Sequence, residues 1–302
     1  MTRALILLLA MAILAPGGYG AYAYVRDYDL YRGFAPPKEP AGIPRGTLQK
    51  LRFWSPALKQ QRQALVYLPP GYGHGATRGV RYPVLYLLHA PVGYARNYIQ
   101  TGGLAVRVDE LLARRAIRPF ITVIPKDHTF GGNHEWANTR AGRYEGFVLD
   151  TVHVVDSRYS TLRSRRARML AGLSTGGFAA ANIALQHLPV FGSFEAWSGY
   201  FAETQTDAFK GASQALLYRN SPALYMTSMT NRLRREPLRA FMYQGSDDDV
   251  SSGTMLSFAR NLRAAGSHVT ARVYPGKHNW RLWRSHFNEM LVFASRSLER
   301  AR

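Results

Sequence analysis

The chain has 302 residues, of which 46% are hydrophobic and 12% aromatic, a composition that excludes an intrinsically disordered protein. It contains no cysteine, which excludes disulfides, thiolate metal sites, a cysteine nucleophile and a lipidated N-terminal cysteine. The formal net charge of +20 indicates an anionic partner, such as a membrane or cell-envelope surface, or else a solvated basic face without a dedicated partner. The densest basic run, Arg158 to Arg168, comes without a zinc-finger or RNA-binding signature, so nucleic acid is not expected as a partner.

The N-terminus has the pattern of an export signal. Arg3 precedes an unbroken apolar run from Ala4 to Ala15, and small residues follow a Pro-Gly-Gly break. This run alone is too short to span a bilayer, but read on to Val25 it reaches about twenty residues, which is enough. Residues 1–25 are therefore predicted to be a signal peptide or a retained membrane anchor. The protein is predicted to be exported, either secreted or held at the outer face of the cytoplasmic membrane.

Proline-rich residues 26–46 are predicted to be a linker or extended arm, and residues 47–302 one folded domain. In that domain, apolar runs typical of buried strands alternate with segments of helical spacing. Strands are predicted over Leu48 to Trp54, Gln63 to Leu68, Val84 to Leu88, Phe120 to Ile124 (stopped by Pro125), Arg168 to Gly172, Phe194 to Trp197, Arg239 to Tyr243 and Val269 to Tyr274. Helices are predicted over Ala105 to Arg115, Phe147 to Val155, Gly177 to His187, Ser251 to Ala265, and from near Trp283 onward.

This order of elements predicts an α/β fold: a doubly wound, mostly parallel sheet with helices on both faces. In such sheets the functional residues lie in loops at the carboxyl ends of the strands. Candidate residues are therefore sought just after each predicted strand.

The segment Gly172-Leu173-Ser174-Thr175-Gly176 fits the pattern Gly-x-Ser-x-Gly of a nucleophile elbow. In an elbow the serine lies on a tight turn from a strand to a helix, and the glycines prevent clashes between these elements. Apolar residues precede the segment and small residues follow it, as a strand and a close-packed helix require. Ser174 is therefore the predicted nucleophile, and the alternative is a Gly/Ser turn without chemistry.

A serine hydroxyl needs an adjacent base, and in this kind of fold an acid and then a histidine follow the serine along the chain. His278 stands in a loop just past the last predicted strand, where the base is expected. His187 ends the helix after the elbow, His268 precedes the last strand in a loop, and His286 lies in the final helix. The acid is expected after the preceding strand, where Asp248 is the first choice and Asp247 the alternative. No residues have the spacing of a metal site, so no metal or cofactor is expected.

A set of short motifs follows in order along about residues 47–296. They are Leu85-Tyr86-Leu87-Leu88-His89, Gly102-Gly103, Ile124-Pro125, Glu135-Trp136, the elbow with Gly177, Trp197-Ser198-Gly199-Tyr200, Gly245-Ser246-Asp247-Asp248, and Pro275-Gly276-Lys277-His278-Asn279-Trp280-Arg281-Leu282-Trp283. Together they resemble the putative-esterase family, whose members include feruloyl and enterochelin esterases, S-formylglutathione hydrolase and mycobacterial mycolyltransferases. The resemblance implies the α/β-hydrolase fold, and it places the acid three residues after the glycine, which favours Asp248.

The resemblance also implies an oxyanion hole made by two backbone amides. One is the amide of Thr175, next to the predicted nucleophile. For the other, the family usually has His-Gly after the first buried strand, whereas this chain has His89-Ala90-Pro91, and proline has no N–H. Either a shifted loop supplies the amide of Ala90 or Val92, or one donor is missing, which lowers the rate by about 10²–10³.

These features predict a serine esterase that hydrolyses carboxylic esters, either of small molecules or of glycolipids, through an acyl-enzyme on Ser174. The alternatives are a mycolyltransferase-like acyltransferase acting on cell-envelope lipids or sugars, and a non-catalytic envelope-binding protein of the same fold. Aromatic residues in or near the predicted loops either line an acyl or sugar pocket or pack in the interior; they are Tyr94, Tyr98, Trp136, Trp197, Tyr200 and Trp280. The sequence leaves the ester, its acyl chain length and the oligomeric state open.

Overall fold

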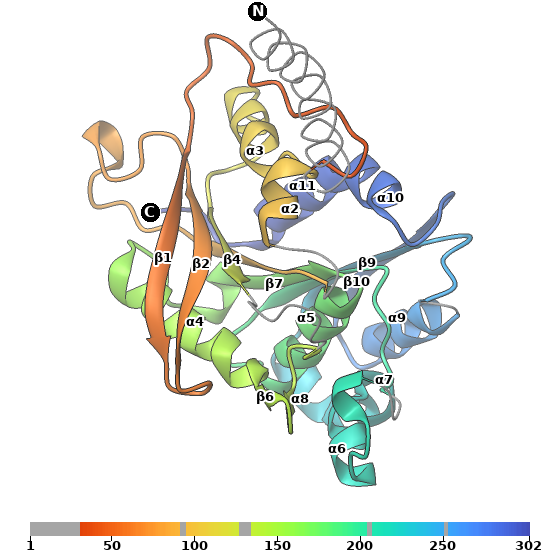
Figure 1. Cartoon of the computed structure of the whole chain (residues 1–302). Helices are drawn as coiled ribbons and strands as arrows, with labels where there is room; N and C mark the ends of the chain where they lie inside the picture. The colour runs from red at the N-terminus through yellow and green to blue at the C-terminus, as the bar shows by residue number, and fades with distance from the viewer. Residues whose placement is uncertain (1–30, 91–94, 127–133, 204–206, 251–252) are drawn as a thin grey trace, which may run out of the picture.

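The structure, a computed structural model, describes residues 31–90, 95–126, 134–203, 207–250 and 253–302. Its centre is an eight-stranded sheet with the spatial order β1-β2-β4-β3-β7-β8-β9-β10 (Figure 1). The strands are β1 (Thr47–Ser55), β2 (Gln60–Leu68), β3 (Val84–Leu88), β4 (Ile121–Lys126), β7 (Arg168–Leu173), β8 (Ser193–Trp197), β9 (Arg239–Gly245) and β10 (His268–Tyr274). The pairs β1–β2 and β2–β4 are antiparallel, and the other neighbours in the sheet are parallel. The predicted α/β fold with a mostly parallel sheet is therefore confirmed.

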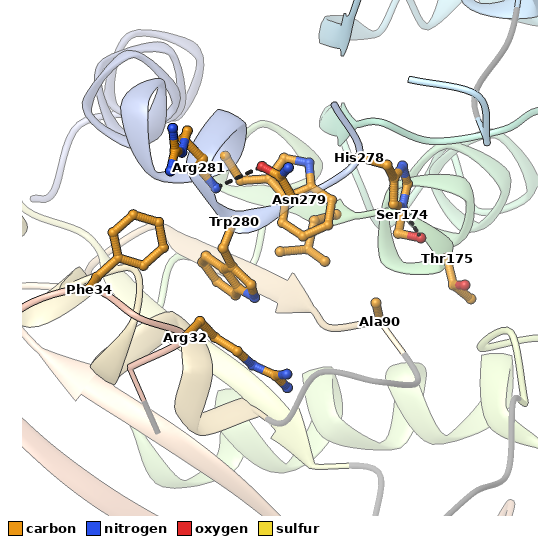
Figure 2. A pocket seen from close by; sticks show the side chains of 11 residues that line it. Arg32, Phe34, Ala90, Ser174, Thr175, His278, Asn279, Trp280 and Arg281 are labelled. Atoms are coloured by element: carbon orange, nitrogen blue, oxygen red, sulfur yellow. Dashed lines mark hydrogen bonds between the residues drawn. The ribbon is translucent and has the colours of Figure 1, made fainter. Parts of the chain in front are cut away.

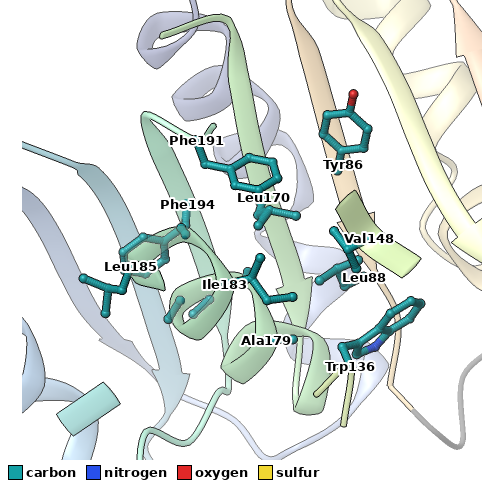
Figure 3. Packing of buried hydrophobic residues seen from close by; sticks show 14 of the residues in the cluster. Tyr86, Leu88, Trp136, Val148, Leu170, Ala179, Ile183, Leu185, Phe191 and Phe194 are labelled. Atoms are coloured by element: carbon teal, nitrogen blue, oxygen red, sulfur yellow. The ribbon is translucent and has the colours of Figure 1, made fainter. Parts of the chain in front are cut away.

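Helices cover both faces of the sheet because its central strands are apolar at consecutive positions, and consecutive side chains point to opposite faces. In β3, Leu85 and Leu87 belong to one core cluster, and Tyr86 and Leu88 to the other. The first cluster is closed by α2 (Ala95–Gln100), α3 (Leu104–Ala113), α10 (Trp280–Ser285) and α11 (Phe287–Ser297). The second is closed by α4 (Tyr144–Arg158), α5 (Thr175–Gln186) and α9 (Thr254–Ala264). Figure 3 shows this second cluster, where side chains of α5 such as Ile183 meet those of the sheet.

The predicted strands and helices are all present, with ends shifted by a few residues, but the prediction missed several short elements. Between β8 and β9 the chain forms α6 (Gln214–Arg219), α7 (Pro222–Tyr225) and α8 (Thr230–Arg235). A small hairpin of β5 (Asn138–Thr139) and β6 (Gly142–Arg143) precedes α4, and α2 was also not predicted. Elements of two to six residues are too short to show a helical or alternating period in the sequence.

The predicted stop of the fourth strand at Pro125 is wrong, because β4 continues through this proline to Lys126. Pro125 lies opposite Ala64 of β2, whereas the pairing of β4 with β3 ends at Val123. Beyond Val123 one side of β4 therefore has no ladder with β3, and a residue without an N–H is tolerated there.

The predicted C-terminal helix is in fact two helices, α10 and α11, separated at His286, so this histidine lies between helices and not within one. The expected position of His268 is also corrected, since it is the first residue of β10 and not part of the loop before it.

Most arginines of the basic run bond to groups within the fold. The buried Arg168 pairs with Asp156 at 2.5 Å, and the Arg165 guanidinium donates to the carbonyl of Leu188 at 2.6 Å. Arg158 and Arg163 likewise donate to backbone carbonyls, at 2.9 and 2.8 Å. This run therefore helps to hold α4, β7 and the end of α5 together, and an anionic partner stays a prediction.

The predicted signal peptide or anchor, residues 1–25, lies outside the described residues. Within the described ranges, no helix is long and apolar enough to cross a membrane. Of the predicted linker, residues 31–46 are described, and they follow an irregular path that ends where β1 begins. The backbone N–H of Gly46 donates to Asp109 of α3 at 2.9 Å, which fixes this end of the segment to the domain.

A carboxyl group lies fully buried in the centre of the sheet. Glu195 of β8 is 0% exposed, and the indole N–H of Trp197 donates to its Oε2 at 3.1 Å. Burial raises the pKa of Glu195 well above its usual range; the Trp197 bond opposes this shift, and the negative charge of Glu289 adds to it. The folded protein therefore keeps Glu195 protonated at pH values where the unfolded chain ionises it.

This difference predicts that Glu195 destabilises the fold increasingly as pH rises above about 4.3, the ordinary glutamate pKa. A Glu195→Gln variant cannot ionise at this position in either state. Its midpoint of thermal unfolding, measured relative to that of the wild type, should therefore rise as pH increases from 5 to 8. Each pH unit over which the folded protein keeps Glu195 protonated is worth about 1.4 kcal/mol, and about 1 kcal/mol shifts the midpoint of a domain this large by roughly 2–4 °C, so the expected gain is roughly 3–6 °C for each such pH unit. Thermal unfolding of both proteins at the two pH values measures it, and an equal difference at both would contradict the shifted pKa.

Candidate active site

Ser174 lies on the sharp turn between the end of β7 and the start of α5. Its backbone has φ 55° and ψ −123°, a conformation that residues with a side chain rarely adopt and that costs about 1–3 kcal/mol. Three backbone hydrogen bonds hold it there: its N–H donates to the carbonyl of Trp197 at 2.8 Å, and its carbonyl accepts from Gly177 at 2.8 Å and from Phe178 at 3.0 Å. The turn lifts the serine side chain out of the strand and presents it at the carboxyl edge of the sheet.

The glycines of the elbow allow this turn by letting backbones touch. A Cβ on Gly176 would lie 1.9 Å from the carbonyl oxygen of Leu88 at the end of β3, and one on Gly172 would lie 2.4 Å from the backbone of Gly176. The first turn of α5 can therefore approach β7 and β3 only when these positions carry no side chain.

Replacing Gly176 with alanine should thus lower the free energy of unfolding by at least about 3 kcal/mol, because backbone must move to accept the methyl group. Helix propensity alone predicts the opposite, a gain of about 1 kcal/mol. Gly73→Ala is the control: this glycine has a positive φ of 76° but no atom within 4 Å of the added carbon, so we expect a loss of about 1 kcal/mol. Urea unfolding of the three proteins distinguishes a clash from a propensity effect.

Three side chains that are far apart in the sequence form a hydrogen-bonded series. The Nε2 atom of His278 lies 2.9 Å from the Oγ of Ser174, and its Nδ1 lies 2.9 Å from Oδ1 of Asp248 (Figure 2 shows the first contact). The Asp248 side chain is 0% exposed and that of His278 is 17% exposed, so the series runs from a buried carboxylate to the pocket. This geometry suits proton transfer from the serine to an imidazole that the carboxylate orients.

The pairing of β9 with β10 brings the acid and the histidine together. Just past the two strands, the N–H of Ser246 donates to Tyr274 at 2.7 Å, and the N–H of Asp247 donates to Gly276 at 2.9 Å. Gly245 allows this approach, because a Cβ there would lie 2.1 Å from the Gly276 carbonyl. Asp247 is exposed and Asp248 buried, so the structure brings Asp248, and not the alternative Asp247, to the imidazole.

The other histidines after the elbow have different surroundings. His187 ends α5 and its Nε2 lies 2.8 Å from a carboxylate oxygen of Glu145, which lowers the pKa of that glutamate against the opposing effect of burial. His286 stacks on Tyr274 with ring centroids 3.5 Å apart, and His268 is an exposed residue of β10. Of these four histidines, only His278 forms a hydrogen bond with Ser174 in the described part of the chain.

Both residues expected to supply oxyanion donors border the same pocket as Ser174 (Figure 2). Thr175 is the first residue of α5, where backbone N–H groups have no partner within the helix. Ala90 follows β3 and is 8% exposed, and in Figure 2 it lies on the side of Ser174 opposite to His278, a residue of the loop between β10 and α10. Pro91 and the alternative donor Val92 lie outside the described residues.

The pocket in front of Ser174 has a volume of about 580 Å³. Its described lining consists of Arg32, Phe34, Ala90, Leu173, Ser174, Thr175, His278, Asn279, Trp280, Arg281 and Trp283. Among the described residues, the lining is apolar and aromatic around a few polar groups, as is usual for small-molecule sites.

Of the aromatic residues considered from the sequence, Trp280 lines this pocket. Tyr98, Trp136 and Trp197 are buried and donate to groups in the interior, and Tyr200 donates to Glu135 at 2.7 Å. Tyr94 lies outside the described residues.

Sequence reasoning missed several residues of the pocket wall. Trp283 stands in the His-x-Trp-x-x-Trp motif, and that motif could have indicated it; its indole N–H donates to Ser198 at 3.0 Å, and its ring meets the edge of His278. Arg32 and Phe34 belong to the predicted linker, where no pattern marks them.

A family model and a relative match this chain. The family model described as "Putative esterase" matches residues 55–294. An endo-1,4-beta-xylanase/feruloyl esterase of Xylanibacter ruminicola is 32% identical over 163 residues, which are 52% of this chain and 22% of that much longer protein.

Among solved structures, a ferulic acid esterase is similar with a TM-score of 0.72 and 24% identity, covering 84% of this chain and all of the other. The S-formylglutathione hydrolase of Agrobacterium tumefaciens has a TM-score of 0.68 and 16% identity, over 88% of this chain and 100% of its own. At these identities the two structures show a shared fold.

Proposed function

The chain belongs to the putative-esterase family of α/β-hydrolases, and from this premise we propose that it is a serine esterase that hydrolyses carboxylic esters through an acyl-enzyme on Ser174. The observation that carries the proposal is the hydrogen-bonded series of Ser174, His278 and Asp248, of which the first two line the pocket. A serine held in a strained turn beside an imidazole and a buried carboxylate has the arrangement that acyl transfer needs.

The first half of the proposed reaction forms the acyl-enzyme. His278 Nε2 takes the proton of Ser174 as the serine oxygen attacks the ester carbonyl. The buried carboxylate of Asp248 stabilises the imidazolium that results and keeps Nδ1–H directed toward itself. The amides of Thr175 and Ala90 stabilise the negative charge on the carbonyl oxygen. The tetrahedral intermediate then collapses, and His278 returns the proton to the departing alcohol.

In the second half, water replaces the alcohol. His278 takes a proton from the water as it attacks the acyl carbonyl, and the carboxylic acid leaves when Ser174 regains its proton. An acyltransferase would follow the same route with a sugar or lipid hydroxyl in place of water, so its acyl-enzyme is the same. The hydrogen-bonded Ser174 and His278 argue against a purely non-catalytic binding role.

The test uses the full chain with p-nitrophenyl esters of increasing chain length and a fluorophosphonate probe, followed by mass spectrometry of the labelled peptide. We expect turnover of the esters and a single modification on Ser174, which heat-denatured protein should not acquire. Labelling of Ser174 without turnover would favour the acyltransferase. Neither labelling nor turnover would contradict both and favour the binding role.

A further inference from the structure

The end of β8 contacts both the proposed nucleophile and the helix that follows the histidine of the site. Trp197, the last residue of β8, accepts the backbone N–H of Ser174 at 2.8 Å. The next residue, Ser198, accepts the indole N–H of Trp283 on α10 at 3.0 Å. The backbone N–H of Ser198 in turn donates to the carbonyl of Tyr243, on β9, at 2.7 Å. Ser198 therefore joins the end of β8 to both β9 and α10, which lead to the acid and follow the histidine.

The backbone of Ser198 has a conformation that favours glycine. Its φ is 50°, in the left-handed region, and the residue is 0% exposed. A side chain is strained in this region, and such strain persists where the surrounding structure imposes it and is concentrated at functional sites. Glycine would relieve the strain, but it could not accept the hydrogen bond from Trp283. The hydroxyl is therefore the part of this residue whose role needs an explanation.

The indole that Ser198 holds packs against the imidazole of His278. The two ring centroids are 5.1 Å apart and the ring planes are at 86° to each other. Trp283 is 6% exposed, and the ring of Trp280 lies 5.7 Å from it at 83°. A hydrogen bond at Nε1 adds a directional constraint to this packing, because its strength depends on the angle at the N–H. The hydroxyl of Ser198 therefore fixes the orientation of the ring that contacts His278.

The orientation of His278 matters most when it is no longer bonded to the serine. In the resting site, Asp248 holds Nδ1 and Ser174 holds Nε2, each at 2.9 Å. In the proposed reaction the bond to Ser174 is given up as the serine attacks, and Nε2 must then serve the departing alcohol and, later, the water. At that stage a single hydrogen bond at Nδ1 would let the ring swing, whereas the contact with Trp283 remains through every step.

We propose that Ser198 is a positioning residue: through Trp283 it keeps the imidazole of His278 aligned with the serine, the departing alcohol and the attacking water in turn. Ser198 is fully buried, so it contacts no substrate and acts only through the indole. Because the neighbouring carbonyl of Trp197 holds the backbone of Ser174, one end of one strand fixes both partners of the proton transfer. The inference rests on the proposed esterase function, since it assigns a role within the same site.

The kinetic test is a double-mutant cycle on the full chain with p-nitrophenyl acetate. Ser198→Ala removes the acceptor, and Trp283→Phe removes the donor but keeps an aromatic ring. In each, kcat should fall about tenfold, since misplacing a reacting group by about 1 Å costs up to about 10². In Ser198→Ala the KM should change less than about twofold. The double variant should lose no more than either single one, because both remove the same hydrogen bond.

The matched control is Ser193→Ala, which removes the same hydroxyl from a residue that is 1% exposed at the amino end of the same strand. Its kcat should stay within about twofold of the wild type. Rates are expressed per folded enzyme, with the folded fraction taken from thermal unfolding of each variant. A merely structural role would lower the unfolding midpoint of Ser198→Ala and leave its kcat unchanged. That result, or a double variant whose loss is the product of the two single losses, would overturn the inference.

A spectroscopic measurement tests the inference without turnover. In protein labelled with ¹⁵N-histidine, proton NMR reports the Nδ1–H of His278 that is shared with the carboxylate, a resonance beyond the amide region that His278→Gln should lack. This resonance should shift or broaden in Ser198→Ala and Trp283→Phe and stay unchanged in Ser193→Ala. An unchanged resonance in the first two variants would overturn the inference. A disturbed resonance in a protein that neither hydrolyses esters nor is labelled at Ser174 would refute the esterase proposal alone.

Discussion

We expect Ser174→Ala to lower kcat for p-nitrophenyl ester hydrolysis by at least about 10⁴-fold. The substitution removes the only atom of this residue that can form the acyl-enzyme. Binding of the ester in the pocket and the oxyanion donors remain. In well-studied serine hydrolases the loss of the serine lowers kcat by up to about 10⁶, and a residual 10³–10⁴ over water comes from those remaining features. The measurement is the initial rate with saturating ester, at enzyme concentrations high enough to detect the residual.

Folding should survive this change. Alanine has the same backbone preferences as serine at φ 55°, and the substitution removes one hydrogen bond to a partly exposed imidazole. The free energy of unfolding should therefore change by about 1 kcal/mol or less. The control is Ser157→Ala, an exposed serine on α4, which should retain full activity. More than about a tenth of the wild-type rate in Ser174→Ala would refute the acyl-enzyme on this serine.

The sequence predicted most of the fold because its central strands are buried on both faces. A run such as Val84 to Leu88 has no polar position, and few structures other than a covered parallel sheet accommodate it. The elbow was predictable for a similar reason: its constraint is local, since Gly172 and Gly176 make the close contacts of one turn. A structural constraint that involves only a few consecutive residues can therefore be predicted from the sequence of those residues.

Contacts between distant segments leave no such pattern. Asp247 and Asp248 are chemically identical in the sequence, and only the hydrogen bonds between the loops after β9 and β10 bury one and expose the other. Phe34 contacts Arg284 although the two are 250 residues apart, so no local period could place Phe34 beside the pocket. The basic run is a further example, because charge density in the sequence does not reveal that Arg165 bonds to backbone carbonyls.

The second large effect on kcat is expected when Asp248, and not the adjacent Asp247, is replaced. In Asp248→Asn, kcat should fall by about 10⁴, because an amide cannot stabilise the imidazolium and its N–H₂ favours the wrong tautomer of His278. The position tolerates the shape of asparagine, since the change is isosteric and the carboxylate oxygen 2.9 Å from Nδ1 is simply replaced. Fluorophosphonate labelling of Ser174 should slow in parallel, because the serine depends on the same base.

Asp247→Asn is the matched control, and we expect its kcat to stay within about twofold of the wild type. Its side chain is exposed, and the contact that it makes with the histidine loop runs through its backbone N–H to Gly276, which asparagine preserves. The two variants remove the same charge from adjacent residues, so a general electrostatic effect on the pocket would lower both rates alike. A loss confined to Asp248→Asn would therefore identify the carboxylate that acts through His278, whereas a loss confined to Asp247→Asn would require the loop after β9 to be in a different register when the enzyme works.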